Sequence, residues 1–307
     1  MRTPVRAALP LFASIALATV LTAVAPADAR ADPPVQIAAR LGAAASHATT
    51  PDGAPDVIVA VPQDVDRTAP LHLVVFLHGH VSCAARYLAS EPTPCLPGNR
   101  PMSGLGVAAA HSASHDGTIL VAPQLAWIAR SSSPGRFGER GFFSRFLREV
   151  VATVVAPTLG RPVTLEQVAS ITLVAHSGGY LTALRILERG DLADRIDAVV
   201  LFDALYAGVS GFAAWAARDG HRIVSIHTAQ PRTSALSVDL ARRLTAVIGV
   251  DEVAVDPAAG VGPAIASHRV VVARTRTPHN DVPRAYLAEV LAALAAARPV
   301  SGGRLPR

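Results

Sequence analysis

Short apolar runs alternate with helical patterns along most of the chain. The runs are rich in β-branched and aliphatic residues and are bounded by proline or glycine, which is typical of strands. Leu71–Leu77 is apolar at nearly every position, as a strand covered on both faces should be. We expect strands at 57–61, 71–77, 118–122, 171–175, 198–202, 223–226 and 270–273, with one edge strand around 35–41.

Between these runs, apolar residues recur at three- and four-residue spacing, which indicates helices with one buried face. We expect such helices at 142–154, 180–187, 212–218, 235–247 and 282–297. Strands that alternate with helices predict an α/β domain, in which a mostly parallel central sheet carries helices on both faces through right-handed crossovers. In such sheets, functional groups gather at the carboxyl ends of the strands.

Composition agrees with one globular domain. The chain has 307 residues, of which 50% are hydrophobic and 17% charged, so a large core is expected and disorder is not. We assign the domain to residues 56–298, after a linker or edge segment at 30–55 and before a flexible tail at 299–307. The formal charge of +5 is spread along the chain, which predicts no nucleic-acid partner.

The N-terminus carries an export pattern. Arg2 and Arg6 precede an apolar stretch at 7–25, and Ala27-Asp28-Ala29 follows as an A-x-A cleavage site. We therefore expect residues 1–29 to be a signal peptide, cleaved after Ala29, and the mature protein to be secreted or periplasmic. An uncleaved membrane anchor is the alternative, because the apolar stretch is long enough to span a bilayer. Pro10 and the small residues argue against it, so we expect no stable membrane span after cleavage.

The chain has two cysteines, Cys83 and Cys95, in one loop-like stretch. An oxidising compartment favours a disulfide between them. Closing so short a loop stabilises by about 3 kcal/mol in the chain-entropy model. A reactive thiol or a metal-binding pair are the alternatives.

The segment from Ile171 to Tyr180 is a buried strand that runs directly into a helix through Ser177. The sharp turn needs small residues two positions before and after the serine, and Ala175 and Gly179 meet that need. This segment resembles the G-x-S-x-G nucleophile elbow of the α/β-hydrolase superfamily, with alanine in the first glycine position. The resemblance implies that Ser177 is a nucleophile and that the Gly178 N–H binds an oxyanion. A serine that merely caps the helix is the alternative.

His78-Gly79-His80 follows the expected central strand and resembles the His-Gly turn found after the third strand in the same superfamily. The resemblance implies that the His80 N–H is the second oxyanion donor. Zinc binding by His78 and His80 is the alternative, but no third ligand has supporting spacing. We therefore expect neither a metal nor an organic cofactor.

The superfamily order is nucleophile, acid, histidine, with the histidine in the loop after the last strand. His279 lies in that loop and is the expected general base. The acid most often follows the seventh strand, but no carboxylate follows 223–226 closely. Asp203 ends the preceding strand instead, and a buried carboxylate there needs a partner such as an imidazole N–H. Asp256 and Asp281 are weaker candidates, and Asp203 as a helix cap is the structural alternative.

The resemblance implies hydrolysis of a small-molecule ester or amide through an acyl-Ser177 intermediate. We favour an ester because no peptide-binding feature stands out. An exported peptidase or amidase, and a catalytically inactive binding protein with the same fold, remain open. The loop 127–141 carries Arg130, Arg136 and Arg140, which either bind a substrate carboxylate or phosphate or are simply solvated. The segment 207–220 is too short for a large lid domain.

Overall fold

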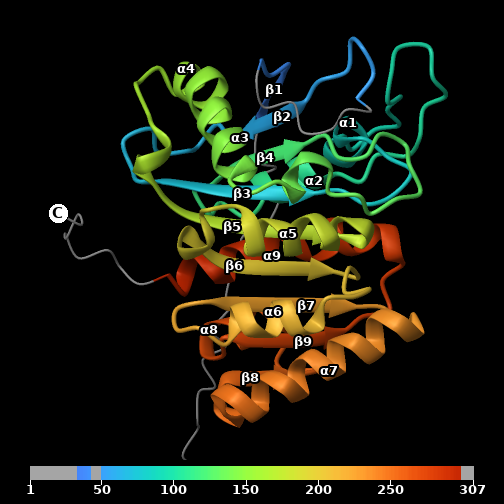
Figure 1. Ribbon diagram of the computed structural model, residues 1–307, viewed down its shortest axis with the longest axis vertical. Helices are drawn as coiled ribbons and strands as arrows, with labels where there is room; N and C mark the ends of the chain where they lie inside the picture. The colour runs from blue at the N-terminus through green and yellow to red at the C-terminus, as the bar shows by residue number, and fades with distance from the viewer. Residues whose placement is uncertain (1–32, 43–49, 299–307) are drawn as a thin grey trace, which may run out of the picture. The chain divides into compact units, whose positions relative to one another are not determined.

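A nine-stranded sheet forms the centre of the described structure (Figure 1), a computed structural model that describes residues 33–42 and 50–298. The signal peptide and tail predicted for 1–29 and 299–307 lie outside these residues. The strand order is β1-β2-β4-β3-β5-β6-β7-β9-β8. The strands are β1 Val35–Ala39, β2 Val57–Val61, β3 Leu71–Leu77, β4 Ile119–Pro123, β5 Val168–His176, β6 Ile196–Phe202, β7 Arg222–His227, β8 Val253–Val255 and β9 Val270–Arg274.

The sheet is parallel except at one edge. β1 pairs antiparallel with β2, and β2 pairs antiparallel with β4. All other neighbours, from β4 and β3 to β9 and β8, are parallel. The predicted edge strand and mostly parallel sheet are therefore confirmed. Because parallel strands need crossovers, their carboxyl ends meet at one edge, the right-hand side of Figure 1.

Helices cover both faces of the sheet, as predicted. The helices are α1 Ala84–Leu88, α2 Val107–Ser112, α3 Phe142–Val150, α4 Ala156–Leu159, α5 Tyr180–Arg189, α6 Val209–Ala216, α7 Pro231–Ile248, α8 Val261–Ser267 and α9 Val282–Ala296. One core cluster joins β-strand side chains such as Val75 and Leu77 to α3, α5, α6 and α7, and the other joins Val74 and Phe76 to α1, α2, α8 and α9. Alternate residues of β3 thus enter opposite cores, as the pleat requires.

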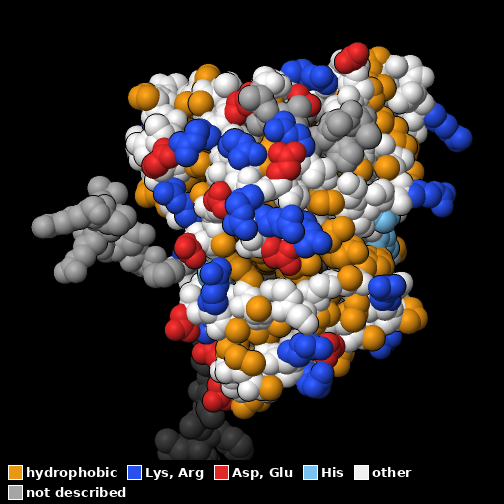
Figure 2. All heavy atoms as spheres, in the orientation of Figure 1, with side chains coloured by type: hydrophobic (Ala, Val, Ile, Leu, Met, Phe, Trp, Pro, Cys, Tyr) orange, Lys and Arg blue, Asp and Glu red, His pale blue; other side chains and the backbone are white. Residues whose placement is uncertain are grey.

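Two details refine the predicted elements. The helix expected at 142–154 is α3, which continues through a π-helical turn at Val151–Val155 into α4. The connection between β6 and β7 contains α6 and short loops, in agreement with the expected lack of a large lid. Within the described ranges, no helix is both long and apolar enough to span a membrane. On the face drawn in Figure 2, arginines and acidic side chains are interspersed.

Candidate active site

Ser177 lies in the turn between β5 and α5, at the carboxyl end of a central strand. Its backbone φ is 53°, in the left-handed region that is uncommon for residues other than glycine. The turn is tight, since a Cβ on Gly179 would lie 2.3 Å from the carbonyl oxygen of Leu77. The small residue after the serine is thus required by close backbone packing, as the sequence pattern predicted.

The loop after β3 packs directly against this turn. A Cβ on Gly79 would lie 2.7 Å from the Cβ of Ser177 and 3.2 Å from its Oγ. A Cβ on Gly178 would lie within 2.4 Å of the His80 Nε2. The structure therefore brings both residues predicted to bind an oxyanion, Gly178 and His80, to the same place beside Ser177.

Side-chain hydrogen bonds hold this loop in shape. The Nε2 of His78 accepts the N–H of Leu125 at 3.0 Å, so its Nδ1–H donates to the carbonyl oxygen of Gly79 at 2.9 Å. The Nε2 of His80 lies 2.7 Å from the Oγ of Ser132. Both histidines thus have structural hydrogen-bond partners. Among the described residues, no group of three or more His, Cys, Asp or Glu side chains is arranged to hold a metal ion.

Asp203 and His279 are in direct contact. The His279 Nδ1–H donates to Oδ2 of Asp203 at 2.7 Å, although 76 residues separate them in the chain. Asp203 follows β6 and is 1% exposed, whereas His279 lies in the loop between β9 and α9 and its side chain is 35% exposed. Since Nδ1 carries the proton, Nε2 of His279 is free to act as a base.

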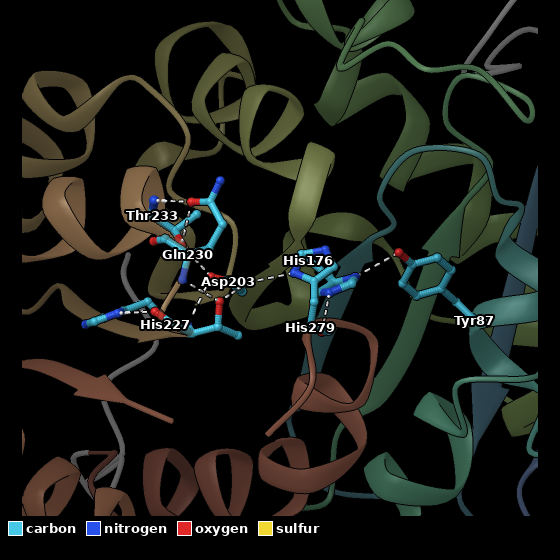
Figure 3. Close-up of polar contacts among 8 residues, drawn as sticks. Tyr87, His176, Asp203, His227, Gln230, Thr233 and His279 are labelled. Atoms are coloured by element: carbon cyan, nitrogen blue, oxygen red, sulfur yellow. Dashed lines mark hydrogen bonds and ion pairs between the residues drawn. The ribbon is translucent and has the colours of Figure 1, made fainter. Parts of the chain in front are cut away.

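Asp203 is held as an anion by four hydrogen bonds, which include the one from His279. Thr228 donates its N–H to Oδ1 at 3.1 Å and its hydroxyl to Oδ2 at 2.8 Å, and the Thr233 hydroxyl donates to Oδ1 at 2.6 Å. Burial alone would raise the pKa of Asp203, but these hydrogen bonds outweigh it and hold the pKa well below its usual range. The carboxylate therefore stays ionised behind the histidine (Figure 3).

The two other carboxylates considered from the sequence have different partners. Asp281 forms an ion pair with Arg284 at 2.8 Å. Oδ1 of Asp256 accepts the backbone N–H of Arg274 at 2.6 Å. Asp203 is thus the carboxylate that contacts His279.

Tyr206, which follows β6, lies near Ser177, and the sequence did not suggest this neighbour. Burial, and the charge of Asp203, raise the pKa of Tyr206, so the phenol is neutral. Within the described residues, no hydrogen bond joins the Ser177 side chain to the His279 side chain. Such contacts are often long in unliganded enzymes and tighten with substrate.

Further residues around the site were missed by the sequence analysis. Thr228 follows β7, where the acid most often lies in the superfamily, and this position now supports Asp203 instead. His176 directly precedes the serine, and its ring lies 4.6 Å from that of His279. Its place in the Ala-His-Ser-Gly-Gly motif was a usable signal. No sequence signal points to Tyr87 or Thr233, because their hydrogen-bond partners are distant in the chain.

Two peripheral features border the site. A pocket of about 910 Å³ lies beside His279 and is lined by polar residues such as Thr228, Gln230 and Arg276 together with apolar ones such as Val261. In the arginine-bearing loop, the Arg136 guanidinium lies 4.5 Å from the ring centre of Phe142 and pairs with Glu139. Arg136 is thus engaged at the surface, while Arg130 and Arg140 are exposed.

Cys83 and Cys95 form a disulfide, which excludes the free thiol and the metal pair. Cys83 immediately precedes α1, so the bridge ties the start of this helix to the following loop. The predicted disulfide is therefore confirmed.

No protein-family model matches the chain, and no curated protein matches its sequence. Its structure resembles that of a protein named FAE, with a TM-score of 0.53 and 12% identity over 86% of this chain and 88% of the other. A feruloyl esterase module from Clostridium thermocellum gives a TM-score of 0.49 at 12% identity, covering 77% of this chain and 82% of that one. Brefeldin A esterase, a bacterial homologue of human hormone-sensitive lipase, gives 0.44 at 15% identity, covering 92% and 79%. At such low identity only the fold is compared. The chain has the α/β-hydrolase fold.

Proposed function

We propose that the protein is a serine hydrolase that cleaves a carboxylic ester, with Ser177 as nucleophile, His279 as general base and Asp203 as the supporting acid. The observation that carries the proposal is the 2.7 Å contact between His279 and the buried Asp203, beside the strained turn of Ser177. A strained serine at a strand end, next to an oriented imidazole, is the arrangement that nucleophilic acyl transfer needs.

In the proposed reaction, Oγ of Ser177 attacks the ester carbonyl while Nε2 of His279 takes its proton. The N–H groups of Gly178 and His80 stabilise the negative oxygen of the tetrahedral intermediate. The intermediate collapses to an acyl-serine, and His279 returns the proton to the leaving alcohol. Water then hydrolyses the acyl-serine through the same groups, and the serine is restored.

The buried acid supports this mechanism electrostatically. When His279 takes the proton it becomes a cation, and the adjacent ionised Asp203 stabilises that charge. The low pKa of Asp203 keeps the negative charge in place through the neutral pH range.

The substrate we propose is a small-molecule ester. The pocket beside His279 has room for a group of moderate size, and its lining combines polar and apolar residues. The esterases named above make the same class of substrate reasonable here by analogy. Export to the periplasm or the medium is part of the proposal, and the disulfide between Cys83 and Cys95 supports it.

Labelling with a fluorophosphonate probe tests the proposal. Wild-type protein is expected to be labelled and Ser177→Ala is not. Ser170→Ala is the matched control, because Ser170 lies on the same strand but at its other end, bonded to His72. Absence of labelling in folded wild type would instead indicate a binding protein. A panel of nitrophenyl esters and aminoacyl amides then separates esterase from amidase, and activity on amides alone would overturn the ester assignment.

A further inference from the structure

A buried row of polar groups connects the loop after β3 to the loop that carries His279. The Gly79 N–H donates to the Tyr87 hydroxyl at 3.0 Å, and this hydroxyl lies 2.8 Å from Nδ1 of His176. Nε2 of His176 lies 3.0 Å from the carbonyl oxygen of His279. Figure 3 shows Tyr87, His176, His279 and Asp203 connected by dashed lines, of which the one between His176 and His279 ends on the backbone carbonyl of His279. The row therefore reaches from the predicted oxyanion loop to the base.

The two ends of the row, together with a neutral His176, fix the direction of every hydrogen bond in it. A backbone N–H can only donate and a carbonyl oxygen can only accept. Tyr87 thus accepts from Gly79 and donates to Nδ1 of His176, whose Nε2–H donates to the His279 carbonyl. Of the two neutral tautomers of His176, only the one with its proton on Nε2 satisfies all three bonds.

Burial keeps both side chains in this state. Tyr87 is 2% exposed and His176 is 0% exposed. Burial, reinforced by the nearby His279, lowers the pKa of His176 to about 3, and burial raises the pKa of Tyr87 to about 12. Neither group changes charge where a hydrolase of this kind works. A neutral His176 also avoids repulsion with the His279 ring, 4.6 Å away, when that ring becomes a cation.

His279 is consequently held at two points. Asp203 fixes its ring through Nδ1, and His176 fixes its backbone through the carbonyl oxygen. A loop residue anchored only by its side chain could shift along the loop, and displacements of about 1 Å at a catalytic group can cost 10²-fold in rate.

Helix α1 gives the row a rigid origin. The Tyr87 N–H donates to the carbonyl oxygen of Cys83, and the Ala84 N–H donates to Oε1 of Gln124 at 3.0 Å. The disulfide joins the same Cys83 to Cys95. The Tyr87 hydroxyl is therefore presented by a short helix that is fastened at its first residue.

We propose that Tyr87 and His176 are positioning residues, which lock the orientation of the His279 loop and the oxyanion loop relative to Ser177. This inference rests on the proposed serine hydrolase function, since it assigns roles in that reaction. Neither residue is a proton donor or acceptor toward substrate. Their loss should lower kcat and leave KM nearly unchanged, because the groups that bind substrate remain.

Tyr87→Phe removes the central hydroxyl and nothing else. We expect kcat for a nitrophenyl ester to fall about 10- to 100-fold, with KM within about twofold of wild type. Thr118→Val is the matched control, since it removes a buried hydroxyl from another buried histidine, His111, with a contact of 2.8 Å before β4. It should lower the unfolding midpoint to a similar degree and leave kcat unchanged.

Two amide variants of His176 test which bond matters. The amide nitrogen of glutamine reaches about as far along the side chain as Nε2, whereas that of asparagine reaches only as far as Nδ1. His176→Gln can still donate to the His279 carbonyl and should retain more kcat than His176→Asn. Equal losses in the two variants, or a better asparagine variant, would contradict the anchoring of His279.

A measurement on the unaltered protein covers the case in which the variants fold poorly. Nitrogen-15 NMR of the histidine side chains should show His176 as the Nε2–H tautomer between about pH 5 and 8, as its pKa of about 3 requires. A charged His176, or its Nδ1–H tautomer, would overturn the row. If wild type is labelled at Ser177 and Tyr87→Phe matches it in kcat, the positioning role fails while the hydrolase function stands. If wild type is not labelled, the function fails first.

Discussion

Asparagine in place of Asp203 should disable the base without altering the shape of the site. Oδ1 of Asp203 accepts the Thr228 N–H, which can only donate, so the asparagine oxygen must occupy that position. The amide nitrogen, which is a donor, then takes the place of Oδ2, the atom that lies 2.7 Å from Nδ1 of His279 in the wild type. Because two donors cannot share this contact, the His279 proton must move to Nε2, the nitrogen that has to accept the proton of Ser177.

The expected loss follows from that change of tautomer. In Ser-His-Asp proteases the same substitution lowers kcat by about 10⁴-fold, which corresponds to about 5.4 kcal/mol of transition-state stabilisation. We expect a loss between about 10³- and 10⁴-fold here. Steady-state hydrolysis of a nitrophenyl ester and the rate of fluorophosphonate labelling both report it. Asp281→Asn is the control, since Asp281 pairs with Arg284 and lies beside the same histidine.

The same variant makes a prediction about stability. The folded-state pKa of Asp203 is depressed, so its stabilising effect is complete above the unfolded pKa, near 4, and is lost as the pH falls through the folded value. The difference in unfolding free energy between wild type and Asp203→Asn should therefore be constant near pH 7 and narrow below about pH 4.

An Asp203→Asn variant that retains kcat within tenfold of wild type would refute the assignment of Asp203 as the acid.

Three more outcomes are expected. Replacing Cys83 and Cys95 by serine should lower the free energy of unfolding by about 3 kcal/mol in denaturant titrations, because the bridge closes a short loop with a sequence separation of 12; an unchanged midpoint would contradict this. Gly79→Ala should abolish labelling of Ser177 while the far-UV spectrum is retained, since its Cβ would lie 2.7 Å from the serine Cβ. Burial lowers the pKa of His111 to about 4, so below about pH 6.5 the unfolded chain binds a proton at this histidine that the folded chain does not bind. His111 should therefore lower stability by roughly 1 kcal/mol per pH unit from about pH 6.5 toward 4, in addition to the contribution of His176, and His111→Leu should reduce the slope by that amount.

Most of the sheet could be predicted from apolar runs. Buried parallel strands are apolar on both faces, so β3 at Leu71–Leu77 stands out with its observed bounds. β5 was predicted shorter than Val168–His176, since its first residues are more polar. The missed elements, β8 and the helices α1, α2, α4 and α8, are too short to complete a periodic pattern. α8 also contains a glycine and a proline, which normally mark a turn.

The residues of the candidate site also fall into those that the sequence could predict and those that it could not. Ser177 and His279 could be proposed because each lies at a fixed place in the order of strands, and Asp203 because a buried carboxylate needs a partner. The contact of Asp203 with His279 agrees with that argument. The supporting hydroxyls of Thr228, Thr233 and Tyr87 could not be found, because hydroxyl side chains leave no periodic trace and their partners are remote in the chain.

At the left-handed backbone position of Ser177, the residue that favours stability differs from the residue that the proposed activity needs. At φ 53° any side chain costs about 1 kcal/mol or more relative to glycine, so Ser177→Gly should relax the turn while it removes the proposed nucleophile. Directed evolution that selects only for protein that stays folded after heating would therefore enrich inactive variants with glycine at position 177. A useful selection must therefore count turnover as well as folded molecules.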